Sequence, residues 1–256
     1  RRQGQMCIRD SDEGELVEVK KIYSGRRIRS DKVLISERLG DASAPRSISL
    51  IAIHQHNIPN TFPDEVILQS KKAALTNNKK WHDYTEMPFV TIDPKDARDH
   101  DDACYAKLDD DPKNPGGHLI WVAIADVAHF VRSGDSIDNE ARYRGNSTYF
   151  PDRVVPMLPD SLSGDLCSLH EGEKRACLVV KMKIDAQGNK LTHKFARALI
   201  QSSASLEYGE VQDAVDKGTG RQEVLQLLEP VLNPLYGAYN SCLLYTSPSP
   251  RDRQKS

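Results

Sequence analysis

Hydrophobic and polar residues alternate in short runs through the first quarter of the chain. Three runs have the two-residue period of a strand, namely residues 14–19, 32–35 and 48–53. Gly25 and the segment 40–45 separate them as turns. Several short strands in so few residues predict a small β-barrel that lacks its first strand.

A helical pattern follows the barrel. Pro63 opens it, with Thr61 as a cap and Asp64 and Glu65 in the first turn, and the pattern predicts a helix that ends near Asn77. A polar linker then leads to a change in composition at about residue 84.

The rest of the chain mixes strand and helix patterns, which predicts an α+β fold. The expected elements are a strand at 87–92, hairpins of 103–108 with 119–126 and of 176–184 with 191–200, and helices at 136–144, 206–217 and 221–232. Pro151, Pro156 and Pro159 favour an extended or irregular segment between them. Residues 240–256 show no periodicity and nothing to bury, which favours a non-native tail over a disordered native one.

Composition narrows the class of protein. The content of 38% hydrophobic and 28% charged residues is typical of a globular protein. The sequence contains no run of about 18 apolar residues, so no membrane-spanning helix is expected. It begins Arg1-Arg2-Gln3, without a methionine or an apolar leader, so an internal fragment is expected. The cysteines are scattered, which argues against zinc or a disulfide framework and favours the cytoplasm: Cys7, Cys104, Cys167, Cys177 and Cys242.

The charge is unevenly distributed. Residues 1–82 carry 15 Lys and Arg against 10 Asp and Glu, whereas the remainder carries 20 against 27. This asymmetry suggests a polyanion-binding module beside a metal-binding one, with ordinary variation in surface charge as an equal alternative.

Five aspartates fall within ten residues after the apolar run at 87–92: Asp93, Asp96, Asp99, Asp101 and Asp102. Carboxylates at close range raise one another's pKa and oppose folding, and divalent cations with hard oxygen ligands offset that repulsion. An EF-hand is disfavoured, because Cys104 stands where a loop counted from Asp99 needs glycine. A solvated acidic turn is the other alternative, but apolar runs on both sides place the loop at the edge of a buried sheet.

Four ordered blocks resemble the RNB domain of the ribonuclease II/ribonuclease R family. They are TIDP with ARDHDDA at 91–103, VAIADVAHFV at 122–131, YFPDRVVPMLP at 149–159 and LCSL at 166–169. The preceding part is similar to the family's second cold-shock-like OB-fold and connecting helix. The resemblance implies an OB-fold at 1–58, a helix and linker at 59–84 and the N-terminal part of an RNB domain at 85–239.

Members of that family are metal-dependent hydrolytic 3′→5′ exoribonucleases that release nucleoside 5′-monophosphates from single-stranded RNA. By match to the motif, the resemblance implies that the catalytic, metal-binding residues are Asp93, Asp99, Asp101 and Asp102, with Mg²⁺ or, as a substitute, Mn²⁺. Asp101 is expected to be the most sensitive to substitution, and Asp96 to be a surface turn residue. Carboxylates at these positions suit one or two ions that activate water and stabilise a leaving oxygen.

The resemblance also implies that Tyr149 stacks on the 3′-terminal nucleotide, which suits an enzyme that accepts any base. Arg26, Arg27 and Arg29 either follow RNA phosphates or form a solvated edge. Four further residues near the motifs receive no catalytic role: His100, Asp126, His129 and His170.

A monomer that binds single-stranded RNA and no membrane is therefore expected. The family's downstream glutamate helix, arginine-rich segment and S1 domain do not occur in these 256 residues. Two alternatives remain open, namely an RNA-binding fragment without turnover and a structural metal-binding domain.

Overall fold

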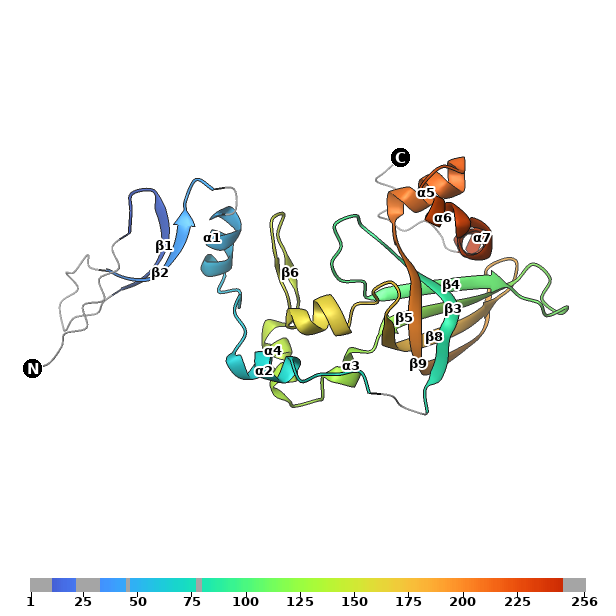
Figure 1. The fold of residues 1–256 in the computed structure, drawn as a ribbon, viewed down its shortest axis with the longest axis horizontal. Coiled ribbons are helices and arrows are strands. Elements are labelled where there is room, and N and C mark those ends of the chain that lie inside the picture. Colours follow the sequence, from blue (N-terminus) through green and yellow to red (C-terminus); the bar gives the residue numbers. More distant parts are fainter. Residues whose placement is uncertain (1–10, 22–32, 45–46, 77–79, 246–256) are drawn as a thin grey trace, which may run out of the picture. The chain divides into compact units, whose positions relative to one another are not determined.

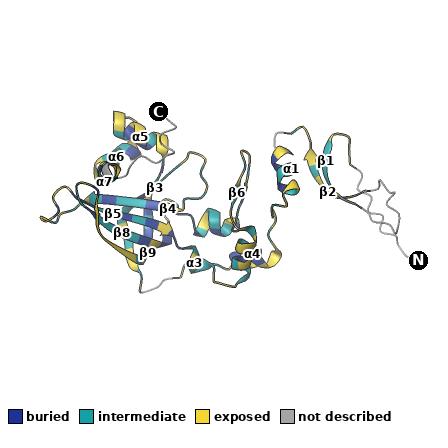
Figure 2. Cartoon of the chain, turned by 180° about the vertical axis from the view of Figure 1, so that it is seen from behind, coloured by how far each residue is buried: buried dark blue, intermediate teal, exposed yellow. Residues whose placement is uncertain are grey.

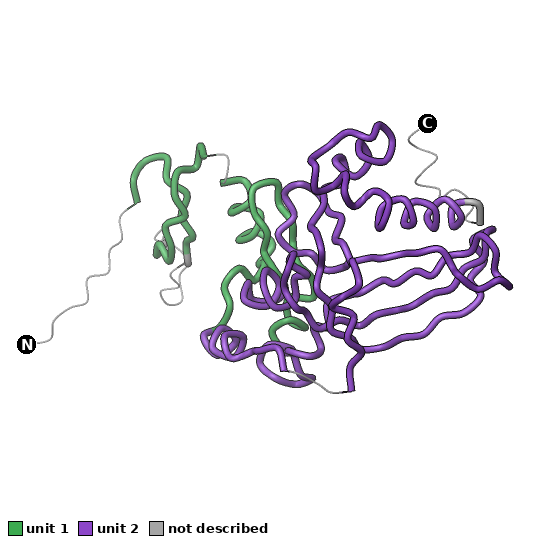
Figure 3. Tube along the Cα trace, turned by 45° about the vertical axis from the view of Figure 1, so that its right-hand side comes forward, with its two compact units in different colours: residues 1–63, 140–157 green, residues 64–139, 158–256 purple. Residues whose placement is uncertain are grey.

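The computed structural model describes residues 11–21, 33–44, 47–76 and 80–245 (Figure 1). The chain divides into two compact units (Figure 3). Unit 1 consists of Arg1–Pro63 and Glu140–Met157, and unit 2 of Asp64–Asn139 and Leu158–Ser256.

Unit 1 begins with two antiparallel strands, β1 (Glu15–Lys21) and β2 (Val33–Asp41), which confirm the first two predicted strands. The third predicted strand, at 48–53, is wrong, because that segment forms helix α1 (Ser47–Gln55). The OB-fold barrel stays a prediction, since residues 1–10 and 22–32 lie outside the described part of the chain.

Side-chain hydrogen bonds explain why α1 is a helix. Ser49 and Ile53, four residues apart, lie on one helix face and are both buried. The Ser49 hydroxyl donates to Asp152 Oδ2 at 2.9 Å, and the Ser47 hydroxyl donates to the Asp41 carbonyl. The alternation of apolar residues at 48–53 therefore also contains a helical stripe, whose partners lie elsewhere in unit 1.

The second part of unit 1 contains the end of helix α4 (Ser136–Arg144) and a small hairpin of β6 (Thr148–Tyr149) with β7 (Val154–Val155). Helix α4 has the predicted bounds. The buried Arg144 guanidinium holds this unit together: it donates to the carbonyls of Pro59 at 2.8 Å and of Thr61 at 2.7 Å, and lies 3.5 Å from the Phe62 ring centroid.

Unit 2 starts with helix α2 (Asp64–Ser70), which ends well before the predicted limit near Asn77. The Ser70 hydroxyl donates to the Ile67 carbonyl at 3.0 Å and accepts from the Ser161 hydroxyl at 2.9 Å. Ser70 is buried in this contact, so the helix ends in a turn rather than continuing into the polar linker.

Five strands form a closed barrel in the order β3-β4-β5-β8-β9. Their bounds are β3 His82–Asp93, β4 Asp102–Leu108, β5 His118–Ala125, β8 Lys174–Ile184 and β9 Lys190–Glu207. β3 pairs with β9 in parallel, and the other pairs are antiparallel. Both predicted hairpins are confirmed, as β4–β5 and β8–β9.

The barrel has one weak seam. β4 and β5 are in register over seven residue pairs, from Asp102 to Leu108, whereas β3 and β4 share only the pair Val90–Cys104. The segment from Asp93 to Asp102, which connects β3 to β4 and holds the five clustered aspartates, is called the acidic loop below. It lies where the barrel is least tightly paired.

Short helices cover part of the barrel. Val90 and Leu206 of the barrel pack with the buried Val211, Val224 and Leu232. These last three come from α5 (Tyr208–Lys217), α6 (Gln222–Gln226) and the π-helical turn η2 (Leu228–Leu232). The helix predicted at 221–232 is thus interrupted, and Pro230, which has no N–H to donate, lies in the second piece. Burial is concentrated on the barrel strands (Figure 2).

Helix α7 (Asn233–Tyr245) continues past residue 239, where the sequence predicts the start of a tail without periodicity. Cys242 packs against a buried cluster of Ala106, Ile184 and Ala238, so residues up to there do have something to bury. Residues 246–256 lie outside the described part. Within the described ranges, no helix is long and apolar enough to cross a membrane.

Two further short elements complete unit 2. They are α3 (Val127–Phe130), directly after β5, and the π-helical turn η1 (Leu162–Leu166). α3 lies within the second sequence block, and η1 follows the third. Ser168 and Leu169, just after η1, hydrogen-bond to the backbone of His100 in the segment between β3 and β4.

Candidate active site

The acidic loop connects β3 to β4, and each end of it is fixed by a strand. Asp93 is the last residue of β3, and Asp102 is the first of β4. Asp101 is fixed through its backbone, because its carbonyl accepts from the Ala125 N–H of β5 at 2.9 Å. Asp96 lies in an exposed turn, as expected.

The four predicted aspartates affect one another's protonation. Burial raises the pKa of Asp101 most, followed by the charges of Asp99, Asp102 and Asp93, and His100 opposes this rise. Burial and the charge of Asp93 also raise the pKa of Asp102. These carboxyl groups are therefore within electrostatic range of each other, and folding concentrates negative charge that protein groups offset only in part.

The pKa of Cys104, two residues into β4, is affected by the same carboxylates. Its pKa rises to about 11, first through burial and then through the charges of Asp102 and Asp93. The thiolate form is accordingly suppressed, and this thiol acts as a small apolar side chain beneath the loop.

His100 contacts one of the four aspartates, which the sequence did not predict. Its Nδ1 lies 2.7 Å from Asp93 Oδ2, and the two side chains are 16% and 15% exposed. The backbone of His100 is anchored too, since its N–H donates to the Ser168 hydroxyl at 3.0 Å and its carbonyl accepts from the Leu169 N–H at 2.8 Å. The imidazole therefore faces the carboxylates. No pattern in the sequence signals this, because Ser168 lies 68 residues away along the chain.

Asp126 lies next to this network as a buried carboxylate, 6% exposed. Arg197 Nε of β9 lies 3.0 Å from Asp126 Oδ2, so the two side chains form an ion pair. Among the described residues, no donor makes a hydrogen bond to that oxygen. Burial, followed by the charges of Asp101 and Asp126, raises the pKa of Cys167 to about 12. The structure therefore places Asp126 in the electrostatic surroundings of Asp101, although not in contact with it.

His129 and His170 occupy structural positions, as the sequence reading assumed. His129 packs edge-on against Trp81 with ring centroids 4.8 Å apart. His170 Nε2 lies 2.9 Å from the Gly164 carbonyl, and its ring is 5.9 Å from that of His100.

The predicted RNA-binding residues lie apart from this loop in the chain. Tyr149 belongs to β6 in unit 1, and its side chain is 64% exposed, so it is not a core tyrosine. Its stacking role stays a prediction. Arg26, Arg27 and Arg29 fall outside the described residues.

The donor chemistry of the loop fits a hard divalent cation, because its carboxylates carry an excess of negative charge that their neighbours only partly balance. Across the described ranges, no three Asp, Glu, His or Cys side chains are grouped closely enough to enclose a metal ion. The magnesium site therefore stays a prediction.

Residues 81–239 match the family model of the RNB domain, which is more than half of the chain. The chain belongs to the RNB-domain family. The RNB match begins at the N-terminal side of β3 and ends within α7, so it contains the whole barrel and the acidic loop.

Curated relatives agree with the RNB match. Ribonuclease R of Vibrio cholerae is 38% identical over 232 residues, which cover 88% of this chain and 28% of that protein. Ribonuclease R of Escherichia coli is 38% identical over 210 residues, which cover 80% of this chain and 25% of that protein. The chain thus spans about a quarter of the length of these relatives.

A solved structure shares the fold. Mycoplasma genitalium RNase R in complex with ribose-methylated single-stranded RNA superposes with a TM-score of 0.72 and 31% identity, over 83% of this chain and 32% of that one. The barrel with its acidic loop is thus an RNB-type arrangement.

Proposed function

We propose that this chain is part of a metal-dependent, hydrolytic 3′→5′ exoribonuclease that degrades single-stranded RNA to nucleoside 5′-monophosphates. The observation that carries the proposal is the acidic loop at the β3–β4 seam, where Asp101 has a raised pKa because of burial and of three neighbouring carboxylates. Such a concentration of carboxylates is unfavourable unless a cation is bound there.

Asp93, Asp99, Asp101 and Asp102 are the residues that would hold Mg²⁺, or Mn²⁺ in its place. When bound, such ions lower the pKa of a water molecule and stabilise the leaving oxygen of a phosphodiester. The chain's own residues supply the positions: β3 fixes Asp93, β4 fixes Asp102, and β5 fixes the backbone of Asp101. His100 orients the Asp93 carboxylate through its 2.7 Å contact.

RNA is the proposed substrate and partner. Two M. genitalium RNase R structures with the same fold hold ribose-methylated single-stranded RNA and double-stranded RNA. In this chain the exposed ring of Tyr149 would stack on the 3′-terminal base, and stacking is sequence-tolerant because every base offers a π-face. We expect a monomer in the cytoplasm.

A second reading is an RNA-binding fragment of the same family without turnover. It is favoured by one observation, that the chain spans 28% of the V. cholerae relative and 25% of the E. coli relative. RNA binding without hydrolysis would then be the property of this chain.

A time course on 5′-labelled single-stranded RNA separates the two readings. With Mg²⁺ the proposal predicts a ladder that shortens from the 3′ end, and with EDTA no shortening. Asp101→Asn should reduce the rate by at least about a hundredfold, as expected for loss of a group that stabilises developing charge.

Asp96→Asn is the matched control, since it removes one carboxylate from the exposed turn of the same loop. It should degrade RNA at the wild-type rate. Shortening that persists in EDTA or in Asp101→Asn would refute the metal-dependent mechanism. RNA that is bound but left intact would favour the non-catalytic fragment.

A further inference from the structure

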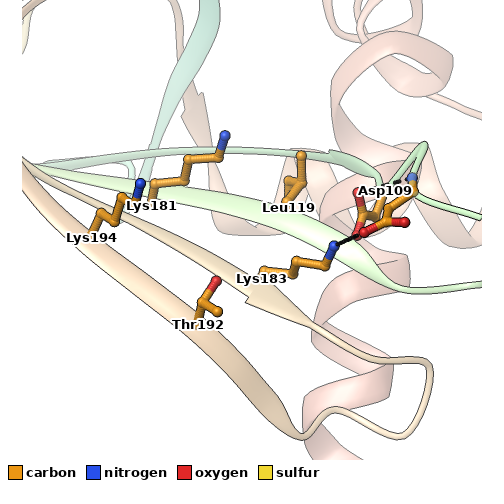
Figure 4. Close-up of a pocket in the computed structure, with 7 residues that line it drawn as sticks. Asp109, Leu119, Lys181, Lys183, Thr192 and Lys194 are labelled. Carbon is orange, nitrogen blue, oxygen red and sulfur yellow. Dashed lines mark hydrogen bonds and ion pairs between the residues drawn. The ribbon is translucent and has the colours of Figure 1, made fainter. Parts of the chain in front are cut away.

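A groove of about 380 Å³ lies on the barrel, away from the acidic loop (Figure 4). It is lined by side chains of β5, β8 and β9 and by the turn after β4: Asp109, Asp111, Leu119, Lys181, Lys183, Thr192 and Lys194. We call it the lysine groove. Its volume falls in the range of about 300–1,000 Å³ that is usual for small-ligand sites.

Strand register explains why these lysines meet. Trp121 pairs with Lys181, and Lys181 pairs with Lys194, so the three side chains form one cross-strand row. Directly opposed residues of antiparallel strands point to the same face of the sheet. Farther along the same face, Val179 is fully buried, so this row stands where the buried part of that face gives way to solvent.

The two ends of the groove differ in charge balance. Lys183 Nζ is paired with Asp109 Oδ2 at 2.8 Å and with Asp111 Oδ2 at 2.7 Å, and in Figure 4 it points toward Asp109. Among the residues that the structure describes, neither Lys181 nor Lys194 forms an ion pair with a carboxylate, and in Figure 4 both point to the same side of the sheet.

Lys181 and Lys194 are therefore like charges held directly opposite each other. Such a pair is unfavourable in a sheet. Lys181 Nζ is oriented by the Trp121 ring, whose centroid lies 4.9 Å away, and a ring face attracts a cation but cannot neutralise it. An anion between the two ammonium groups would remove the repulsion.

The acidic loop cannot supply that anion. Asp102 pairs with Ile124, three residues along β5 from Trp121. An odd offset puts Asp102 and Trp121 on opposite faces of the sheet, roughly 10 Å apart along the strand. The lysine groove is thus a separate site.

We propose that the lysine groove binds a phosphate group of single-stranded RNA, between Lys181 and Lys194 and within reach of the Thr192 hydroxyl. Lysine ammonium groups and threonine hydroxyls are ordinary donors to backbone phosphates. The identification of the ligand as RNA rests on the proposed function, whereas the anion site follows from the charge arrangement alone. The groove would hold substrate outside the acidic loop.

The test is RNA binding in EDTA, where hydrolysis does not interfere. Fluorescence anisotropy with a labelled oligouridylate would compare wild type with the double variant Lys181→Gln, Lys194→Gln over a range of salt concentrations. Affinity should fall about tenfold, and the slope of log K against log salt should decrease by about 0.7, the value for the loss of one phosphate contact to a single strand.

The double variant Lys71→Gln, Lys72→Gln is the control, because it removes the same charge from exposed lysines of unit 2 outside the groove. If both double variants lose the same affinity, or if wild type does not bind the oligonucleotide, the groove is not an RNA site. Competition by poly-L-glutamate as effective as that by RNA would overturn the assignment in favour of an acidic protein partner.

A local reporter guards against misfolding as the cause. The chain has 2 tryptophans, so in a Trp81→Phe background Trp121 is the only tryptophan, and excitation at wavelengths that tyrosine does not absorb reports on it alone. Saturating RNA should change the emission of Trp121, because a phosphate would draw the Lys181 ammonium away from the ring. Unchanged emission would place the ligand elsewhere. The ladder assay with Mg²⁺ on the same preparation tests hydrolysis separately. Failure of RNA binding in the groove therefore does not count against hydrolysis, and failure of hydrolysis does not count against the groove.

Discussion

Among single residues, the buried carboxylate of Asp126 provides the clearest energetic argument. It is 6% exposed, and its ion-pair partner Arg197 has a side chain that is 50% exposed. Removing one member of such a pair leaves the charge of the other without compensation, which destabilises the fold. A buried carboxylate without a cation costs more than a guanidinium that can turn toward water.

We therefore predict that Arg197→Gln destabilises the fold more than Asp126→Asn does. The losses should be roughly 2 and 1 kcal/mol, below the cost for a fully buried pair because Arg197 is half exposed. Urea unfolding monitored by circular dichroism measures both. The reverse order would mean that Asp126 does not depend on Arg197 for its charge balance.

At this scale the sequence selects four candidate carboxylates but does not predict what surrounds them. Asp93, Asp99, Asp101 and Asp102 stand in one short motif, so a local pattern is enough to select them. The contact of His100 with Asp93 depends on the anchoring of His100 by Ser168 and Leu169, which are distant in the chain. A pattern read along the sequence contains no such information.

Helix α7 depends on a glycine in the β8–β9 turn. Gly188 has φ +81°, and a Cβ there would lie 2.1 Å from the carbonyl oxygen of Ser241 in α7. The backbone of the turn and that of the helix therefore approach more closely than any side chain allows.

Gly188→Ala should accordingly destabilise the fold by more than the roughly 1–2 kcal/mol expected for a left-handed backbone alone. Gly172→Ala isolates that backbone cost, since Gly172 has φ +75° and no atom within 4 Å of its added Cβ. Urea denaturation of the two variants gives the difference. Equal losses in the free energy of unfolding would show that a side chain at position 188 does not clash with α7.

The turn after β4 is tied to β8 by an ion pair that should respond to acid. Hydrogen bonds from Lys183 and then from Asn114 lower the pKa of Asp109 to about 2. The unfolded value is about 3.9, so the stabilisation is complete above about pH 4 and is lost as the pH falls through about 2.

Lys183→Met should therefore flatten the loss of stability between about pH 4 and pH 2, relative to wild type. Comparing the two proteins by urea unfolding at several pH values cancels the carboxylates that Lys183 does not contact. Asp111, whose pKa Lys183 also lowers, contributes in the same direction as Asp109. Parallel curves in that window would mean that Lys183 does not lower the pKa of Asp109.

Helices and strands were predictable from the sequence where the apolar residues follow either the strand period or the helix period, but not both. The β4–β5 and β8–β9 hairpins and helix α4 have strong local patterns and are found nearly as expected. The segment at 48–53 satisfies both periods, and the contact of Ser49 with Asp152, 103 residues away, favours the helix. Residues 240–245 were expected to bury nothing, but Cys242 packs against apolar residues of β4 and β8 that the local pattern does not reveal.

For the molecule as a whole, the acidic loop links the two sides of the weakest seam in the barrel. β3 and β4 share only the register pair Val90–Cys104, and the carboxylates at the end of β3 and the start of β4 repel each other. A cation held by both strands would therefore close the seam and stabilise all of unit 2. Binding to the folded state alone contributes about 2.7 kcal/mol at a ligand concentration of a hundred times Kd.

Mg²⁺ should raise the melting temperature of the wild-type protein by several degrees over its value in EDTA, as measured by differential scanning calorimetry. Asp101→Asn should show two opposite effects. In EDTA it should melt no lower than wild type, because its neutral side chain relieves the repulsion that raises the pKa of Asp101. In Mg²⁺ it should gain little, while Asp96→Asn should gain as much as wild type. A wild-type melting temperature that does not respond to Mg²⁺ would contradict a cation bridging β3 and β4.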